Sequence, residues 1–198
     1  RCCAALLEQL YFVARRRARA PSIGMATARA VERGMQMTDM LHDGSRQLQD
    51  HFGTRQKADS LVERRVHGAI STEDQAFMER MSMFFLATVD ENGHVNCSYK
   101  AGEPGFVRVV DEGTIAFPNY NGNGMYLSMG NVVQTGEVGL LFVDFENQRR
   151  MRLNGTATID LADPLMTAYP DAQFVVRVQT REIFPNCARR VPKLQPAR

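Results

Sequence analysis

The sequence predicts a mainly β protein of the β-barrel class, with one helix inserted among its strands and more helices before them. Three observations favour this class. Residues 84–184 break into about six to seven short segments with the period of strands. Turn signals separate most of these segments, so neighbours pair as antiparallel hairpins. Hairpin-joined strands in this number tend to close into a barrel, because closure removes exposed edges.

The composition narrows the class of protein. A chain of 198 residues with 44% hydrophobic residues suggests one domain with additions. A formal net charge of +2 is too small to indicate a nucleic-acid partner, and no apolar run is long enough to cross a membrane. The four cysteines have no CxxC spacing, so we expect neither a metal site nor a disulfide framework, and a reduced, cytoplasmic setting fits best.

The N-terminal residues 1–34 differ from the rest in composition. They contain Arg15, Arg16 and Arg17 but only two acidic residues, Glu8 and Glu32. One interpretation is an Arg-rich targeting segment. The other, which we favour, is a non-native extension ahead of a start at Met25, Met35 or Met37. In either case we expect this segment to be disordered and dispensable for folding.

Residues 35–70 are predicted to be a helical segment that leads into the main domain, residues 71–184. Helices are expected at 44–52 and 54–66, the second of them capped by Thr54 and ended by Gly68. Ser71 and Asp74 have the spacing of a capping box, which opens a helix to about Met81. Residues 185–198, rich in Arg and Pro, are expected to form a loose tail.

The first expected hairpin joins residues 84–89, apolar on both faces, to residues 94–100 through an Asn-Gly turn. The second strand alternates strictly. One of its faces carries polar side chains, namely Asn96, Ser98 and Lys100. The other carries Val95, Cys97 and Tyr99. We expect the polar stripe to face away from the barrel core.

A second hairpin is expected from residues 106–110 and 114–117, after which Pro118 ends the apolar run. An Asn/Gly turn and a helix follow, and Gly136 should stop the helix. The apolar face predicted for this helix consists of Met125, Met129, Val132 and Val133. Residues 138–145 are almost continuously apolar, which predicts a strand buried on both faces.

The glycine turn before this helix has two interpretations. Gly122 and Gly124 would let an anion approach the backbone N–H groups at the helix start. A plain turn with left-handed glycines is equally consistent with the local pattern. The dinucleotide fingerprint is incomplete, because Leu127 stands where its third glycine belongs, and no P-loop is present.

The last strands are expected at residues 149–161 and 173–184, with a short helix between them that begins at Pro164. In the first of these strands the inner side chains are Met151, Leu153, Gly155, Ala157, Ile159 and Leu161. Arg150 and Arg152 fall on its outer side. Pro185 is expected to end the final strand.

In this order of elements the chain resembles the pyridoxamine 5'-phosphate oxidase-like family, the FMN-binding split barrels. The resemblance covers about residues 71–184. It is carried by the Phe84–Gly93 hairpin segment, the strand ending in Lys100, the Asn119 turn, the Leu127–Asn131 helix and the Arg149–Gly155 strand. No single motif is specific, but their order and spacing are.

The resemblance implies a homodimer that holds FMN at the subunit interface and acts on a small-molecule substrate. It also implies which residues bind the cofactor. These are Asn96, Ser98, Tyr99, Lys100, Pro118, Asn119, Asn123, Gly124, Ser128, Arg150 and Arg152. It identifies no catalytic residue in this chain.

The chain departs from the family in two places. Where the oxidase carries Ser-Arg-Lys against the FMN phosphate, this chain has the uncharged Gly122-Asn123-Gly124. The Arg-Leu-x-Pro segment that meets the oxidase's substrate is replaced by residues 184–187, which include Cys187. Pyridoxamine phosphate is therefore not the expected substrate. We expect an FMN-dependent oxidoreductase of unassigned substrate; the alternatives are a deazaflavin-dependent reductase on the same fold and a non-catalytic flavin-binding protein.

Overall fold

A computed structural model of the chain describes residues 40–187 and 189–194. The chain divides into two compact units, residues 1–55 and 56–198. The expectation for residues 1–34 lies outside the described residues. The described part of the first unit consists mainly of α3 (Asp43–His51). No helix in the described part of the chain is long and apolar enough to span a membrane.

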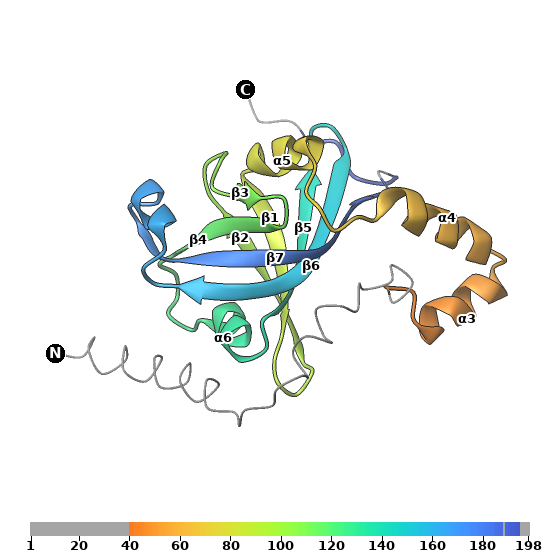
Figure 1. Cartoon of the computed structure of the whole chain (residues 1–198), viewed down its shortest axis with the longest axis horizontal. Helices are drawn as coiled ribbons and strands as arrows, with labels where there is room; N and C mark the ends of the chain where they lie inside the picture. Colours follow the sequence, from red (N-terminus) through yellow and green to blue (C-terminus); the bar gives the residue numbers. More distant parts are fainter. Residues whose placement is uncertain (1–39, 188, 195–198) are drawn as a thin grey trace, which may run out of the picture. The chain divides into compact units, whose positions relative to one another are not determined.

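The second unit contains every strand of the described chain and confirms the mainly β fold with added helices (Figure 1). Its helices are α4 (Arg55–Arg65), which begins at the unit boundary, α5 (Thr72–Glu79), α6 (Leu127–Gln134) and the 3₁₀ helix η2 (Pro164–Ala168). Its strands are β1 (Met83–Val89), β2 (Val95–Ala101), β3 (Arg108–Asp111), β4 (Thr114–Tyr120), β5 (Glu137–Asp144), β6 (Arg149–Asp160) and β7 (Ala172–Asn186).

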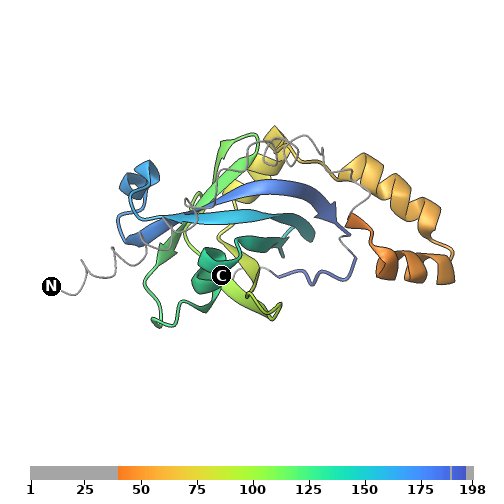
Figure 2. The same ribbon diagram turned by 60° about the horizontal axis from the view of Figure 1, so that its bottom comes forward.

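The seven strands form one antiparallel sheet in the order β2-β1-β5-β6-β7-β4-β3. Three strands separate β1 from β4 in this order, yet Phe84 of β1 meets Phe117 of β4 with ring centroids 5.0 Å apart. The sheet must therefore curl so that both residues reach one core. Figures 1 and 2 show α5 and α6 on opposite sides of the curled strands.

Local signals explain most of the element boundaries. The Ser71 hydroxyl accepts the backbone N–H of Asp74, and the Asp74 carboxylate accepts the Ser71 N–H, which completes the predicted capping box of α5. Gly93 and Gly136 have φ of 85° and 77°, as the predicted hairpin turn and helix end require. At Gly136 an added Cβ would also lie only 3.0 Å from the Thr156 methyl group.

Burial on β1 and β5 corrects the expectation of strands buried on both faces. In β1 only Phe84, Leu86 and Thr88 are buried, while Ala87 is exposed. β5 alternates in the same way and is buried on both faces only at its end, where Val143 and Asp144 follow Phe142. One face of each strand packs on the core, and the other lies on the outside of the sheet.

Two prolines predicted to end strands lie inside them. β4 continues through Pro118 to Tyr120, and β7 continues through Pro185 to Asn186. Pro118 pairs only with Val175 of β7, because β3 begins at Arg108, opposite Ala116, and does not reach it. Pro185 pairs only with Met151 of β6. A proline is tolerated where one side of its strand has no partner, because its missing N–H then leaves no ladder bond unmade.

Smaller corrections concern apolar faces. Met125 precedes α6 and is 63% exposed, and Val133 is exposed, so the buried face of α6 consists of Ser128, Met129 and Val132. The helix begins two residues later than Met125 because its N-cap is Tyr126. Leu161 lies beyond β6 and is exposed, whereas Met151, Leu153, Gly155 and Ala157 are buried as expected.

Phe84 is the residue on which the curl depends. It is fully buried, and its ring also contacts Phe106 and Phe142. We expect Phe84→Ala to lower the free energy of unfolding by about 3–5 kcal/mol, because the truncation leaves a cavity between β1 and β4. Urea denaturation followed by circular dichroism measures the change.

Val110→Ala is the matched control, since Val110 is 41% exposed on the edge strand β3. It should shift the free energy of unfolding by no more than about 0.5 kcal/mol. Equal losses in the two variants would mean that Phe84 does not hold the curl.

Candidate functional site

The polar stripe of β2 lies on the core side of the sheet, not on the outer side as expected. Lys100, Ser98 and Asn96 pair directly with the buried residues Phe84, Leu86 and Thr88 of β1. Directly opposed residues of an antiparallel pair point to the same face, so the stripe faces inward at the rim of the core. Alternation predicted the two faces correctly but did not reveal which one is inner.

A hollow of about 390 Å³ opens beside this stripe. Its walls are β2, the end of β4, the loop 121–126 and the first turn of α6. The lining residues are Asn96, Cys97, Ser98, Tyr99, Lys100, Asn119, Tyr120, Gly122, Asn123, Gly124, Met125, Tyr126, Leu127, Ser128 and Met129. The size lies within the range of small-molecule and cofactor sites.

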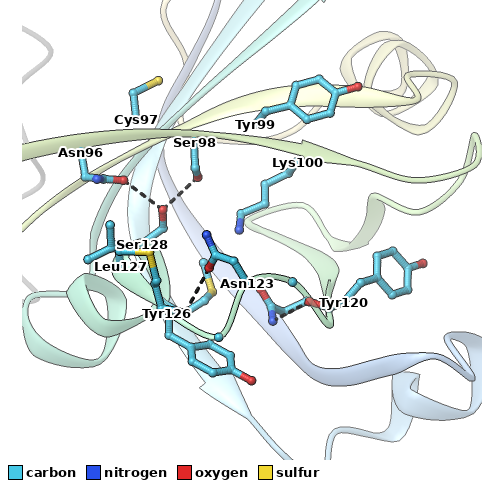
Figure 3. A pocket seen from close by; sticks show the side chains of 15 residues that line it. Asn96, Cys97, Ser98, Tyr99, Lys100, Tyr120, Asn123, Tyr126, Leu127 and Ser128 are labelled. Atoms are coloured by element: carbon cyan, nitrogen blue, oxygen red, sulfur yellow. Dashed lines mark hydrogen bonds between the residues drawn. The ribbon is translucent and has the colours of Figure 1, made fainter.

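Figure 3 shows how the β2 side chains divide. Asn96, Ser98 and Lys100 point toward α6 and the loop, whereas Cys97 and Tyr99 point away from it. The Ser128 hydroxyl of α6 lies 2.9 Å from Ser98 Oγ and 3.2 Å from Asn96 Oδ1. This small network joins α6 to β2 and fixes the polar floor of the pocket.

A second set of bonds holds α6 on β1. Asn131 Nδ2 donates to Thr88 Oγ1 at 3.1 Å, and the Thr135 hydroxyl donates to the Val89 carbonyl at 2.8 Å. Thr88 is buried, so its hydroxyl needs such a partner. The helix that forms one pocket wall is therefore anchored at both of its ends.

Lys100 is the only cationic side chain that lines the pocket among the described residues. Its side chain is half-buried, and burial lowers the pKa of its ammonium group below the ordinary value of 10.5. No described side chain makes a hydrogen bond or ion pair with this ammonium. A partly desolvated charge without a partner is unfavourable, and a bound anion would relieve it.

The loop opposite Lys100 leaves backbone donors open. No side chain caps the start of α6, and no acidic residue lies in its first turn. Gly124 has φ of 75°, which favours glycine, and an added Cβ at Gly122 would meet nothing within 4 Å. Close packing therefore does not require a glycine at position 122. The open space next to Gly122 belongs to the pocket, which this residue lines.

These features fit the phosphate and ring of a flavin mononucleotide. The Lys100 ammonium and the N–H groups at the start of α6 suit a phosphate. The amide of Asn96 and the hydroxyl of Ser98 suit the polar edge of the ring. Among the described residues that line the pocket none is Asp, Glu or His, and no cluster of three metal-ligating side chains occurs in the described chain.

Three residues expected at the cofactor do not line the pocket: Pro118, Arg150 and Arg152. Pro118 is buried within β4. On the outer side of β6, the Arg150 guanidinium donates to the Cys187 carbonyl, and that of Arg152 lies 5.7 Å from the centre of the Phe184 ring. Arg150 and Arg152 share their side of the strand as expected, away from this hollow.

Several pocket residues are not among those expected at the cofactor, and four of them are exposed and apolar: Tyr120, Met125, Tyr126 and Leu127. Met125 is predicted on the buried helix face, Leu127 is named only in the fingerprint and in the helix motif, and no role is predicted for Tyr120 or Tyr126. Asn123 is the one local signal that could have helped. Its side chain accepts the Met125 N–H at 3.0 Å, which is the turn that delays the start of α6.

The pKa of Lys100 yields a prediction about stability. Between the lowered pKa and 10.5 the unfolded chain binds more protons than the folded one, so this residue's contribution to stability rises with pH. We expect Lys100→Met to stabilise the ligand-free protein at neutral pH, with an advantage that shrinks as the pH approaches 10.5. Urea denaturation at neutral pH and at about pH 10 tests this.

Lys57→Met is the control, since Lys57 is exposed on α4 and pays no comparable desolvation cost. A loss of stability in Lys100→Met at neutral pH would mean that the ammonium has a favourable partner in the ligand-free protein.

A family model described as pyridoxamine 5'-phosphate oxidase matches residues 70–184, more than half of the chain. A search of the curated proteins finds no match. Among solved structures, HupZ from Group A Streptococcus is 21% identical with a TM-score of 0.49, covering 64% of this chain and 99% of that one.

An FMN-binding protein from Syntrophomonas wolfei is 16% identical with a TM-score of 0.45, covering 69% and 97% of the two chains. HutZ, the heme storage protein from Vibrio cholerae, is 16% identical with a TM-score of 0.42, covering 59% and 94%. Likenesses this distant do not assign a ligand to this chain.

Proposed function

The chain belongs to the pyridoxamine 5'-phosphate oxidase family, and on this premise we propose that it is an FMN-dependent oxidoreductase with its flavin in the pocket beside β2. The observation that carries the proposal is the half-buried Lys100 ammonium, which has no partner among the described residues and faces a glycine loop at an uncapped helix start. An anion at this place would pair with the Lys100 ammonium and accept hydrogen bonds from the N–H groups at the start of α6.

Each wall has a separate task in this proposal. Lys100 supplies the full charge, and the N–H groups at the start of α6 supply directed donors. Asn96 and Ser98, held by Ser128, orient the polar edge of the ring. The bound flavin would supply the hydride chemistry, and the protein would supply binding and orientation.

Pyridoxamine phosphate does not suit this pocket as a substrate. It carries a phosphate of its own, and the described lining offers one cation, which the cofactor would use. The remaining exposed rim is apolar and aromatic, with Tyr120, Met125, Tyr126 and Leu127. We therefore propose a small-molecule substrate without a phosphate group.

A non-catalytic flavin-binding role is the second candidate. It is favoured by the absence of Asp, Glu and His among the described pocket residues, because these are common proton donors and acceptors in catalysis. Steady-state turnover of reduced nicotinamide by the flavin-loaded protein would support the enzyme. Flavin binding without turnover of a reduced nicotinamide or an oxidisable amine would support the binding protein.

We also propose that the protein is a homodimer formed through the outer face of β1 and β2. Val95 is 85% exposed and Tyr99 60% exposed on that face, and Cys97 is exposed between them. The register places Phe85 and Ala87 beside Tyr99 and Cys97. An exposed apolar patch of this kind is typical of a protein interface.

For the cofactor, we expect Lys100→Ala to weaken FMN binding by about 10- to 100-fold, since a charge-assisted hydrogen bond is lost. Riboflavin has no phosphate and should lose much less. Fluorescence titration of both ligands, with circular dichroism to confirm folding, measures the effect. Exposed Lys57→Ala is the control. Unchanged FMN affinity, or equal losses for FMN and riboflavin, would show that Lys100 does not contact the phosphate.

For the assembly, light scattering at micromolar concentration should give the mass of a dimer. Val95→Glu should convert it to a monomer, because a charge would then be buried in the apolar interface. Val110→Glu, on the edge strand β3, should leave the dimer intact. A monomer that still binds flavin in the parent protein would overturn the proposed interface.

A further inference from the structure

Gln173 of β7 links the pocket loop to the sheet. Its Oε1 accepts the Tyr126 hydroxyl at 3.0 Å and the Asn119 Nδ2 group at 3.2 Å. Asn119 is buried at the end of β4, and Tyr126 closes the loop 121–126. One neutral oxygen therefore ties the loop to two strands. Gln173 itself does not line the pocket.

Tyr126 is an unusual residue for the place that it holds. It is the N-cap of α6 and has φ of 50° and ψ of 27°, in the left-handed region that a residue with a Cβ rarely adopts. Helix caps are ordinarily Ser, Thr, Asp or Asn, whose side chains accept an N–H of the first turn. The side chain of Tyr126 instead reaches away to Gln173, so no side chain caps α6.

The left-handed backbone of Tyr126 and the bond from its side chain to Gln173 are linked. The backbone of Tyr126 is strained, and a strained conformation persists only where its surroundings hold it. The bond to Gln173 anchors the far end of the Tyr126 side chain, while the Tyr126 carbonyl accepts the first helical N–H, from Gly130, at 2.6 Å. If Tyr126 relaxed, the peptide that follows it would turn and the first N–H groups of α6 would change direction.

We propose that Gln173 is a positioning residue, which holds Tyr126 in its left-handed conformation and so aims the open N–H groups of α6 at the anionic group of the ligand. This inference rests on the proposed flavin function. Because Gln173 is neutral and does not line the pocket, it acts through the geometry of the loop and not through charge. Its loss should affect a ligand's phosphate and leave the ring contacts of Asn96 and Ser98 unchanged.

Tyr126→Phe is the decisive variant, because it removes only one hydroxyl from a residue that is 44% exposed and should fold normally. Gln173→Leu breaks the same bond from the other side and also removes the acceptor of the Asn119 Nδ2 group. Each should weaken FMN binding by about three- to tenfold, the usual effect of one lost hydrogen bond. The double variant should lose no more than Gln173→Leu alone, since the bond between Tyr126 and Gln173 can be lost only once. Riboflavin affinity should stay at the parent value in all three.

Gln179→Leu is the matched control on the same strand. The Gln179 side chain bonds to Thr114 and to the Gly113 carbonyl at the β3–β4 turn, and it does not line the pocket. The substitution Gln179→Leu removes comparable glutamine hydrogen bonds and should leave FMN affinity unchanged. Circular dichroism and a thermal melt accompany each variant.

The outcomes separate this inference from the function on which it rests. A parent protein that binds neither FMN nor riboflavin overturns the flavin function, and the inference with it. A parent that binds FMN, with Tyr126→Phe binding it equally well, overturns the inference alone. Equal losses of FMN and riboflavin, or equal losses in Tyr126→Phe and Gln179→Leu, would show a general structural effect and also overturn it.

Discussion

The contact between Phe84 and Phe117 is the constraint on which the remaining structure depends. Strands that are separated by three others in the sheet can share this contact only if the sheet curls. The curl gives β1 a buried inner face, and β2 shares that face through its register with β1. The inner side chains of β2 are polar, so they cannot join the core. These side chains instead form the floor of a pocket at the rim of the core. The loop 121–126 and α6 form the other walls of this pocket (Figure 3).

The pocket favours an anionic ligand because the fold leaves positive charge unpaired on two of its walls, at Lys100 and at the start of α6. The core side of the sheet removes part of the water around Lys100, which lowers its pKa, and no described group pairs with it. Across the hollow, Tyr126 directs its side chain to Gln173 and leaves α6 without a side-chain cap. Unpaired charges and uncapped helix starts are found chiefly at functional sites in stable proteins. The unpaired ammonium and the uncapped helix start here both favour the same kind of ligand, an anion.

The sequence predicts what depends on local patterns and misses what depends on neighbours. The capping box at Ser71, the glycine turns and the alternation of β2 and β6 are local, and the structure has them. Which face of β2 is inner depends on its pairing with β1, and no single strand encodes that. Pro118 is predicted to end its strand, but β4 continues through it because β3 begins only opposite Ala116, and no local pattern shows where β3 begins. Gln173 lies 47 residues from Tyr126, so no local motif could have joined them.

The central claim is that this pocket is built for the phosphate-bearing flavin, and the most direct test identifies the chromophore that the protein carries. The purified protein is denatured, and the released small molecule is identified by mass spectrometry. The account predicts the mass of FMN, close to one per chain. Release of riboflavin, a deazaflavin or heme, or no flavin even after incubation with excess FMN, would contradict it.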